Sequence, residues 1–306
     1  MDRLDAMKML VTVVDAGSLS AAGRGLNVPL TTLSRKISAL EARLGTHLLL
    51  RSTRRLALTD AGIAYVAAAR RILDEVEEAE RAAAGEFTLP RGELVLTAPV
   101  MFGSLHVLPV VADFLAAFPD IRVRLILVDH TLDLVDAHVD MAVRIGALPD
   151  SSMVATRIGL MRAVVCASPA LLADGGMPAT PDDLAGLPCI GLDTPLSSSI
   201  WRFRGKGRMR VTDVRVTPRL SVTTTDAVVS AAIRGIGFAQ LLHYQVSQAV
   251  RDGALRIVLE AFERLPVPIS LLHVPRGQMP LKMRCFLDFA TPRLRQRMAP
   301  PQPMRD

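Results

Sequence analysis

Apolar residues recur at spacings of three and four positions between residues 30 and 44. This stripe consists of Leu30, Leu33, Ile37, Leu40 and Leu44. The spacing predicts an amphipathic helix whose apolar face packs on its own domain. A shorter helix is expected just before it, through AAGRGL, because Ser18 or Ser20 can cap its start. Asn27 tolerates the left-handed backbone of a sharp turn between the two helices.

Small residues support a close crossing of these two helices. Ala21, Ala22 and Gly23 stand where the first helix meets the second, and Gly23 costs roughly 1 kcal/mol of helix propensity relative to Ala. A close helix contact justifies that cost. Pro29 suits the first helical position, where no N–H is needed. In such a helix-turn-helix the second helix enters the major groove of DNA.

The outer face of the second helix is polar and basic. It carries Thr31, Thr32, Ser34, Arg35 and Lys36, whose hydroxyl and cationic groups reach base edges or phosphates. The next stretch, LLLRSTRRLALT, predicts a short hairpin with Arg51, Arg54 and Arg55 at its tip, placed to contact phosphates or the minor groove. A basic helix face alone is more often merely solvated, so the combined pattern carries the DNA-binding prediction.

A long helix is expected from Thr59 and Asp60 to about Ala84. Its apolar stripe consists of Ile63, Val66, Ala67, Ile72, Leu73 and Val76, and its far end, DEVEEAERAAAG, is acidic. A rod of this length needs a partner to bury its stripe. Residues 85–91 then indicate a hinge.

From Glu93 onward, short β-rich runs alternate with helical patterns, which predicts an α/β fold with a parallel sheet and βαβ crossovers. The stretch LDLVDAHV is interpreted as a solvated helix, and a hairpin is expected around Gly205–Gly207. The last helix should cover Leu281 to about Met298, followed by a disordered tail, residues 300–306.

Charge is unevenly distributed along the chain. The formal net charge of the 306 residues is +6. Residues 24–55 hold seven basic residues and one acid, whereas residues 56–86 hold seven acids and three arginines. The sign thus reverses where the DNA-binding pattern ends, which is typical of separate functions and permits a polyanionic partner.

Nothing in the sequence predicts a secreted or membrane protein. The start, MDRLDAMKML, lacks the order of a signal peptide, and the uncharged run Leu94–Ala112 contains Pro99, Gly103 and Pro109. That run is interpreted as strand, turn and buried helix. The three cysteines, Cys166, Cys189 and Cys285, form no CxxC pair and are expected to be buried small hydrophobic residues. We therefore expect a cytoplasmic protein.

The segment GSLSAAGRGLNVPLTTLSRKISALEARLGTHLLLRSTRRLALTDAG closely resembles the winged helix-turn-helix of LysR-type transcriptional regulators. It departs from the family pattern at Gly23, where Ala is usual, and at Pro29, where Ser or Thr is usual. The order DL, DMAVRIG, CASPALL, W.F and DAVVSAAIRGIGFAQLL further on resembles the family's effector domain.

The resemblance implies an α/β architecture of an N-terminal winged helix-turn-helix (1–58), a linker helix and hinge (59–91) and an effector domain (92–299). The effector domain resembles periplasmic binding proteins, with one subdomain at 92–163 plus 267–299 and another at 164–266. It implies a homodimer or tetramer through the linker helix, double-stranded DNA with an interrupted palindromic operator, and a small-molecule effector that alters DNA binding. No membrane partner and no cofactor are implied.

Candidate effector contacts lie at the carboxyl ends of predicted strands, where loops and helix N-termini converge. They are Pro99, Val100, Met101, Phe102, Arg144, Ile145, Gly146, Thr223, Thr224 and Thr225. A helix N-terminus favours anions, and Arg144 can pair with one, so a carboxylate effector is favoured. Two alternatives stay open: Arg144 forms an ion pair with Asp140 or Asp129, and Met101 and Phe102 belong to the core.

Other signals are weaker. His130, Asp133, Asp136, His138 and Asp140 scatter around a helix and predict no metal site. RGKGRMR, residues 204–210, lacks the phosphate-loop spacing and is interpreted as an exposed turn, and RGIGF has too few glycines for a dinucleotide site. Ser104 is not in a GxSxG context.

Two other classes of function were weighed against a transcription regulator. A solute-binding transport component shares the effector fold but needs a signal peptide and no basic N-terminal domain. An enzyme needs converging catalytic groups, and the sequence contains no such set. Both alternatives are therefore disfavoured.

Overall fold

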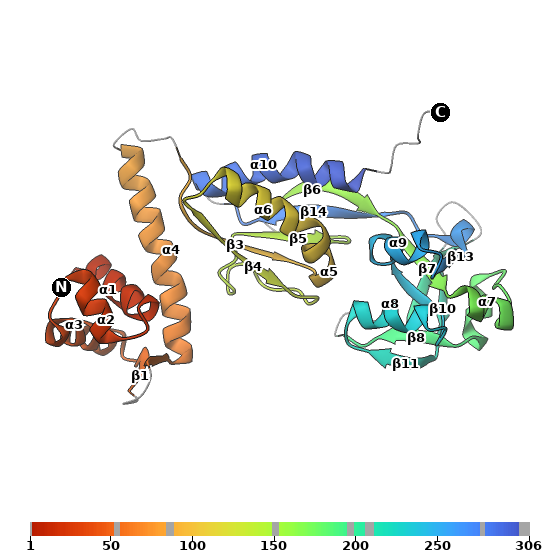
Figure 1. Cartoon of the computed structure of the whole chain (residues 1–306), viewed down its shortest axis with the longest axis horizontal. Helices are drawn as coiled ribbons and strands as arrows, with labels where there is room; N and C mark the ends of the chain where they lie inside the picture. Colours follow the sequence, from red (N-terminus) through yellow and green to blue (C-terminus); the bar gives the residue numbers. More distant parts are fainter. Residues whose placement is uncertain are drawn as a thin grey trace. The chain divides into compact units, whose positions relative to one another are not determined.

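The structure is a computed structural model that describes residues 2–51, 56–83, 89–148, 153–194, 199–205, 211–275 and 279–299 (Figure 1). The chain divides into two compact units, Met1–Gly92 and Glu93–Asp306. The first unit contains helices α1 (Arg3–Asp15), α2 (Leu19–Leu26), α3 (Leu30–Leu44) and α4 (Asp60–Ala83), with the antiparallel strands β1 (Leu49–Arg51) and β2 (Leu56–Leu58).

The turn between α2 and α3 forms as the sequence predicts. The Ser18 hydroxyl caps α2 by accepting the N–H of Ala21, and Asn27 adopts the left-handed conformation with φ 53°. A Cβ on Gly23 would lie 2.9 Å from the carbonyl oxygen of Val28, so the close approach that justifies a glycine there is confirmed. Pro29 is the N-cap of α3, one residue before the position expected for it.

The apolar stripe of α3 is shorter than predicted. Leu33, Ile37 and Leu40 are buried with Leu10, Val13 and Leu48 in the core of the first unit. Leu30 is 47% exposed and Leu44 is 40% exposed. The prediction was wrong for these two end residues, because the first and last turns of α3 extend beyond the small domain that covers its middle.

Helix α4 starts where the sequence indicates. The Thr59 hydroxyl accepts the N–H of Gly62 and donates to the carbonyl of His47. A Cβ on Gly62 would overlap the carbonyl oxygen of Leu48, so the first turn of α4 packs directly on the backbone before β1. An ion pair between Arg70 and Asp15 joins α4 to α1.

The second unit contains two lobes, and Tyr244 of the second lobe packs into the core of the first. Lobe I is built on one sheet with the strand order β4-β3-β5-β14-β6. Its elements are β3 (Gly92–Ala98), α5 (Val100–Phe102), the π-helical turn η1 (Gly103–Val107), α6 (Leu108–Ala117), β4 (Ile121–Leu127), β5 (Met141–Ile145), β6 (Val154–Met161), β14 (Val267–His273) and α10 (Leu281–Met298).

The expectation of a parallel sheet was wrong for two strand pairings of lobe I. Strands β3 and β5 are parallel, but β14 runs antiparallel to both β5 and β6. The cause is topological: β6 carries the chain out of lobe I and β14 brings it back, so the two strands that enter and leave the lobe run in opposite directions.

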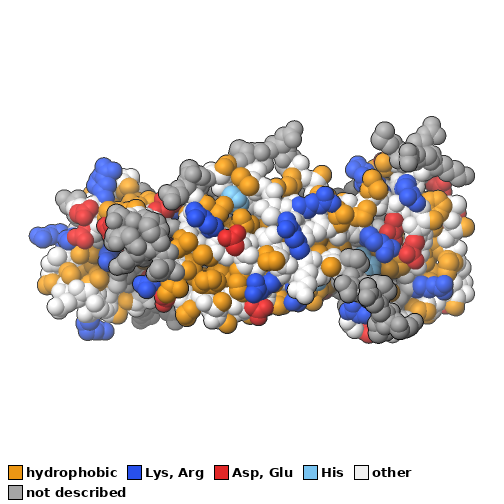
Figure 2. All heavy atoms as spheres, turned by 90° about the horizontal axis from the view of Figure 1, so that it is seen from above, with side chains coloured by type: hydrophobic (Ala, Val, Ile, Leu, Met, Phe, Trp, Pro, Cys, Tyr) orange, Lys and Arg blue, Asp and Glu red, His pale blue; other side chains and the backbone are white. Residues whose placement is uncertain are grey.

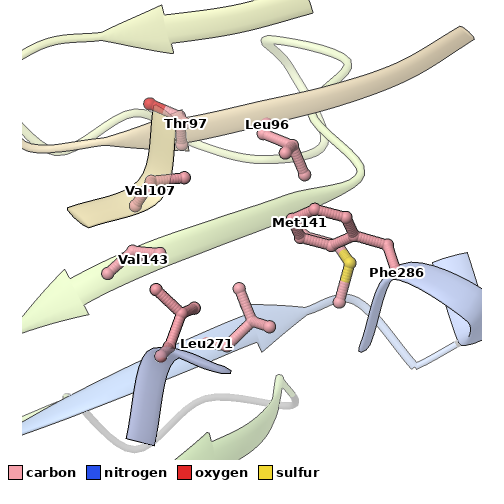
Figure 3. A pocket seen from close by; sticks show the side chains of 8 residues that line it. Leu96, Thr97, Val107, Met141, Val143, Leu271 and Phe286 are labelled. Carbon is pink, nitrogen blue, oxygen red and sulfur yellow. The ribbon is translucent and has the colours of Figure 1, made fainter. Parts of the chain in front are cut away.

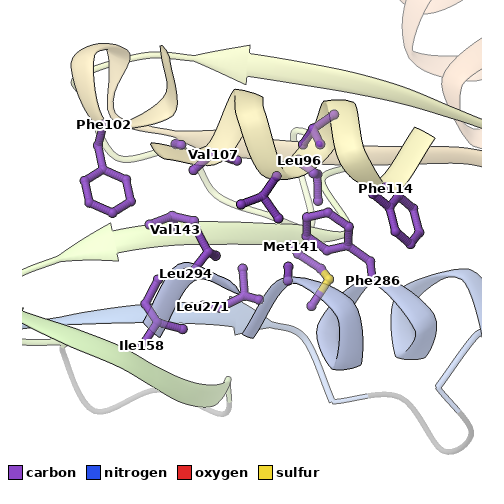
Figure 4. Packing of buried hydrophobic residues seen from close by; sticks show 14 of the residues in the cluster. Leu96, Phe102, Val107, Phe114, Met141, Val143, Ile158, Leu271, Phe286 and Leu294 are labelled. Carbon is purple, nitrogen blue, oxygen red and sulfur yellow. The ribbon is translucent and has the colours of Figure 1, made fainter. Parts of the chain in front are cut away.

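Helices α6 and α10 cover the sheet and bury most of the lobe I core (Figure 4). Phe114 of α6 and Phe286 of α10 meet edge to face with ring centroids 5.1 Å apart. A cavity of ≈ 10 Å³ remains between Leu96, Met141, Leu271 and Phe286 (Figure 3). This is about the volume of one water molecule and the lining is apolar, so the cavity is a packing gap and not an effector site.

The run Val100–Ala117 forms α5, η1 and α6 without a break. By length and composition alone it is apolar enough to cross a membrane. In the structure Phe102, Val107, Val110 and Phe114 of this run point into the lobe I core. The strand, turn and helix expected for the region are thus present, with only one side of the helix buried.

Lobe II has smaller sheets, with orders β12-β7-β13, β11-β8 and β10-β9. Its elements are β7 (Ala163–Ala167), α7 (Pro169–Gly175), η2 (Pro181–Gly186), β8 (Cys189–Leu192), β9 (Ile200–Arg204), β10 (Val211–Arg215), β11 (Pro218–Val222), α8 (Thr225–Ile233), β12 (Ala239–Leu242), α9 (His243–Arg251), β13 (Arg256–Val258) and η3 (Glu260–Phe262). The expected hairpin is present as β9 and β10, and the centre of its turn lies outside the described residues.

The stretch LDLVDAHV is not the helix that was expected. Residues 131–139 form irregular turns. The Asp133 carboxylate accepts the N–H groups of Val135 and Asp136, and His138 has a left-handed backbone with φ 52°. The carboxylate thus caps a single helical turn, in which the N–H of Ala137 donates to the carbonyl of Asp133 at 3.0 Å, and the left-handed His138 ends that turn.

Candidate DNA-binding and effector-binding sites

The outer face of α3 presents most of the predicted DNA contacts. Thr31, Ser34 and Arg35 are exposed, and Thr32 is half-buried. They lie on the side of α3 opposite Leu33 and Ile37, which hold the helix in the domain. The arrangement presents two hydroxyls and a guanidinium on a firmly seated helix, and this is the chemistry that base edges and phosphates accept.

Lys36 lies at the edge of this face. Its ammonium group is 3.4 Å from the Asp5 carboxylate of α1, and 30% of its side chain is exposed. Arg54 and Arg55 of the hairpin lie outside the described residues, and so does the side chain of Arg51. Their role in DNA binding stays a prediction.

Glu41 ties the recognition helix to the wing. Its Oε1 accepts the N–H groups of Leu48 at 2.7 Å and Leu49 at 3.0 Å, and the residue is 6% exposed. Burial raises the pKa of this carboxyl, but the hydrogen bonds from Leu49 and Leu48 and the nearby His47 outweigh it, so the pKa is lowered. A charged Glu41 therefore fixes β1 relative to α3. The sequence shows Glu41 only as a single acid in a basic stretch, which does not predict that it binds the backbone of β1.

Three strand ends converge in lobe I, as the effector prediction requires. The segment Pro99–Phe102 follows β3, the segment 128–132 follows β4, and Arg144–Gly146 ends β5. The N–H of Val100 donates to Asp129 at 3.0 Å, and the N–H of Gly146 donates to the carbonyl of Pro268 at 2.9 Å. Ile145 packs partly against the core. The same strand-end rule predicts a role for residues 128–132, which the sequence reasoning missed.

Arg144 forms no ion pair with Asp140 or Asp129. Its guanidinium donates to the carbonyl oxygens of Leu132 at 2.8 Å and His130 at 3.4 Å. Asp140 accepts the N–H of Val95. Burial lowers the pKa of Arg144, since it removes water from around the cation. The ion-pair alternative is therefore wrong, and the guanidinium retains its capacity for an anion.

Met101 and Phe102 belong to the lobe I core, as one of the alternatives held. Phe102 is completely buried and Met101 packs partly against the same cluster. Phe102 also meets Tyr244 of lobe II edge to face at 5.4 Å, and His106 lies 5.7 Å from the same ring. No sequence signal could link these residues, because α5 and α9 are distant in the chain.

The threonines at the start of α8 lie in lobe II. Thr223 and Thr224 are exposed, and Thr225 is buried. Asp226 occupies the helix start: hydrogen bonds from the Thr224 hydroxyl and from nearby backbone N–H groups lower its pKa. A carboxylate of the chain itself thus uses part of the anion-binding capacity expected there.

Within the described ranges, no group of three or more His, Cys, Asp or Glu side chains could hold a metal ion. Cys166 and Cys189 are buried, and burial raises their thiol pKa to about 12 and about 11. Cys285 is only half-buried. The prediction of buried cysteines is confirmed for the first two.

Two family models match the chain. The one described as the LysR substrate binding domain covers residues 88–295, and the one described as the bacterial regulatory helix-turn-helix protein of the lysR family covers residues 4–63. An HTH-type transcriptional regulator of Xanthomonas campestris pv. campestris is 34% identical over 290 residues, which span 94% of this chain and 84% of the relative.

Solved structures give the same result. The LysR-type regulator CrgA from Neisseria meningitidis is 29% identical, with a TM-score of 0.61 over 96% of this chain and 99% of CrgA. Full-length LysG from Corynebacterium glutamicum, a structure with bound effector Arg, is 22% identical, with a TM-score of 0.57 over 97% of this chain and 99% of LysG. The likeness to LysG concerns the fold alone.

Proposed function

The chain belongs to the LysR family of bacterial transcriptional regulators, and from that premise we propose which residues read its operator and what kind of effector it senses. It is a DNA-binding regulator with a C-terminal effector-binding domain, and not an enzyme. The exposed polar face of α3 is the observation that supports the assignment of individual DNA contacts. We assign base or phosphate contacts to Thr31, Thr32, Ser34, Arg35 and Lys36, with Arg51, Arg54 and Arg55 along the adjacent backbone.

Fluorescence anisotropy with the DNA upstream of its own gene tests the recognition face. Arg35→Ala should weaken specific binding by about 1–3 kcal/mol, because a guanidinium contact to a base or phosphate is lost. Arg43→Ala is the matched control, since Arg43 is exposed in the last turn of the same helix. Equal losses for both variants, or binding to scrambled DNA with the same affinity and salt dependence, would contradict the assignment.

The oligomer is proposed to form through α4. Ile63 is 58% exposed, and Ile72, Leu73 and Val76 are only half-buried in the single chain. Pairing two copies along this stripe would bury it and place two recognition helices on one operator, which suits an interrupted palindrome. Pairing of dimers then gives a tetramer. Cytoplasmic localisation belongs to the same proposal, since the relatives are bacterial DNA-binding regulators.

The effector is proposed to be a small carboxylate held between the lobes. Arg144 supports this, because among the described residues its guanidinium binds only the backbone carbonyls of His130 and Leu132. The proposed contact set is Pro99, Val100, Arg144, Ile145, Gly146, Thr223, Thr224 and Thr225, whereas Met101 and Phe102 belong to the lobe I core. Lobe I then corresponds to subdomain 92–163 plus 267–299 and lobe II to 164–266. Binding changes the arrangement of the lobes and thereby the spacing of paired recognition helices.

A thermal-shift screen with aliphatic and aromatic carboxylates, each beside its neutral amide, tests this proposal. A carboxylate should raise the melting temperature of the wild type, its amide should not, and Arg144→Met should abolish the shift. A shift that persists in Arg144→Met would refute the role of Arg144. A hit must also change DNA affinity, because a ligand that binds both states equally shifts nothing.

A further inference from the structure

Lobe II carries a second concentration of positive charge, far along the chain from the helix-turn-helix. Residues 202–219 contain seven Lys and Arg and one acid, Asp213, so this stretch alone carries +6. That equals the net charge of the whole chain. The recognition of DNA by α3 makes no use of it.

The described part of the stretch is a ribbon with two different faces. Trp201, Phe203 and Val214 point into the core of lobe II and are at most 6% exposed. Arg202, Arg204 and Arg215 alternate with them and are exposed. The register places Arg202 opposite Asp213, Arg204 opposite Val211 and Arg215 opposite Ile200, so the three arginines share the outer face.

This outer face is only weakly neutralised. Arg202 lies 3.8 Å from Asp213, and both side chains are more than half exposed, so the pair is screened by water. Arg204 donates to the carbonyl oxygen of Ala261 at 2.7 Å, which orients its guanidinium without cancelling the charge. No acidic partner is found for Arg215 among the described contacts.

We propose that the outer face of the β9–β10 ribbon is a second DNA-binding surface, which contacts the phosphates of duplex DNA flanking the operator. Guanidinium groups bind phosphate oxygens in a bidentate manner, and a buried inner face holds these arginines on a rigid ribbon. Once α3 is bound, the effector unit is tethered near the same duplex at high effective concentration. Arginine–phosphate contacts of the ribbon that are weak on their own therefore increase the affinity of the whole protein for DNA.

Phosphate contacts are independent of sequence, so the surface would extend the footprint without narrowing the choice of operator. Figure 2 shows Lys and Arg side chains at several places on one face of the molecule, with Asp and Glu beside some of them. The inference rests on the proposed DNA binding by α3. It concerns the second unit of the chain and a different part of the DNA.

The test measures how affinity depends on salt for the full-length protein. Arg202→Gln/Arg215→Gln removes two charges from the ribbon, and Arg122→Gln/Arg124→Gln removes two exposed arginines from β4 as the matched control. Each variant is titrated with a short duplex that covers only the operator and with a long duplex that adds flanking DNA. Salt is varied between about 50 and 200 mM. The emission of Trp201, the single tryptophan, checks that the ribbon stays folded.

On the long duplex, the magnitude of the slope of log affinity against log salt should decrease in the ribbon variant by about 2 for each subunit whose ribbon contacts the duplex, because each phosphate contact contributes about 0.9. The short duplex should show no such change, and the β4 variant should behave like the wild type on both. Scrambling the flanking sequence should leave the effect intact.

Equal slopes for the wild type and the ribbon variant on the long duplex would overturn the proposal. So would an equal decrease in the β4 variant, which would reduce the effect to net charge. Unchanged slopes with loss of regulation in cells would assign the face to an acidic protein instead. Failure of the wild type to bind the short duplex specifically, or no effect of Arg35→Ala on it, would instead refute the role of α3.

Discussion

At the scale of single residues, two glycines show why a glycine stands in a helix. One is required because a side chain would not fit, and the other is not required by its surroundings. Gly62 at the start of α4 leaves no room for a Cβ beside the carbonyl oxygen of Leu48. Gly25 in α2 has no atom within 4 Å of the position that a Cβ would take. The sequence alone gives both residues the same helix penalty.

Gly62→Ala should destabilise the first unit by about 1–3 kcal/mol, because the added methyl group forces the start of α4 away from β1. Gly25→Ala should be neutral or stabilising by about 0.5–1 kcal/mol, since it only removes freedom from the unfolded chain. Hydrogen exchange of peptides from α1 to α3, followed by mass spectrometry, measures both effects. Equal protection in the two variants would contradict the steric account.

Glu41→Gln should lower the stability of the first unit by about 1.5 kcal/mol at neutral pH, because charged hydrogen bonds to Leu48 and Leu49 are weakened. The folded pKa of Glu41 is lowered, so the stabilisation is present above the unfolded pKa and is lost as the pH falls through the folded value. The difference between wild type and variant should therefore shrink in acid.

Urea unfolding of the first unit at neutral and acidic pH measures this difference. Glu80→Gln serves as the control, since Glu80 is exposed on α4. A constant difference across the pH range would show that Glu41 acts without its charge.

The sequence predicts the conformation and contacts of a residue only when the neighbouring residues in the chain determine them. The left-handed Asn27 and the close approach at Gly23 follow from neighbouring residues, and both are confirmed. Glu41 and Arg144 acquire their partners from segments that fold back on them, so their contacts could not be predicted. The ion pair considered for Arg144 was wrong for this reason.

At the scale of elements, the side chain of Arg162 joins the two chain segments that connect the lobes. Arg162 connects β6 to β7, and its guanidinium forms a bidentate pair with Glu263, at 2.8 and 2.7 Å, in the returning segment. Its bond to Glu260 is longer, at 3.2 Å. Only 14% of the Glu263 side chain is exposed, against 64% for Glu260.

A double-mutant cycle of Arg162→Met and Glu263→Gln should give a coupling energy of about 1 kcal/mol, and the cycle with Glu260→Gln should give less than about 0.5 kcal/mol, because an exposed single bond is screened by water. Urea unfolding followed by Trp201 emission measures both. Equal coupling energies would mean that burial and bidentate geometry do not matter at this crossover.

The prediction of helices worked where an apolar stripe was long and failed where a left-handed residue ended the helix after one turn. The boundaries of α3, α4 and α10 follow their apolar stripes and caps closely. The stretch 131–139 has helical spacing too, yet only one turn forms after Asp133, and the left-handed His138 ends it. Periodicity shows which side chains are apolar, and it does not show where a backbone turn ends a helix.

At the scale of the whole molecule, the order of strands in lobe I depends on the C-terminus. Strand β14 lies between β5 and β6, and α10 supplies Met283, Phe286, Ala290 and Leu294 to the core. The alternation of strands and helices predicted the α/β class. It did not predict that β14 lies between β5 and β6, since the sequence of a strand does not show which strands pair with it.

Ending the chain after Leu265 should abolish hydrogen-exchange protection in β3 and β5, because their sheet loses β14, which pairs with β5, and the helix α10, which covers the core. The α1–α3 peptides should keep their protection, since the first unit has its own core. Ending the chain after Met298 provides the control and should preserve protection everywhere. Protected β3 and β5 in the shorter chain would show that lobe I folds without β14.

The position of β14 also bears on how the protein is made. Ile145 ends β5 and His273 ends β14, so roughly 130 residues are synthesised between them, which takes about 6–25 s at usual ribosomal rates. Throughout that interval the nascent chain exposes an unpaired strand edge and the apolar face that α10 will cover. The helix-turn-helix is by then complete, so a stalled ribosome would release a DNA-binding fragment that lacks the sensor.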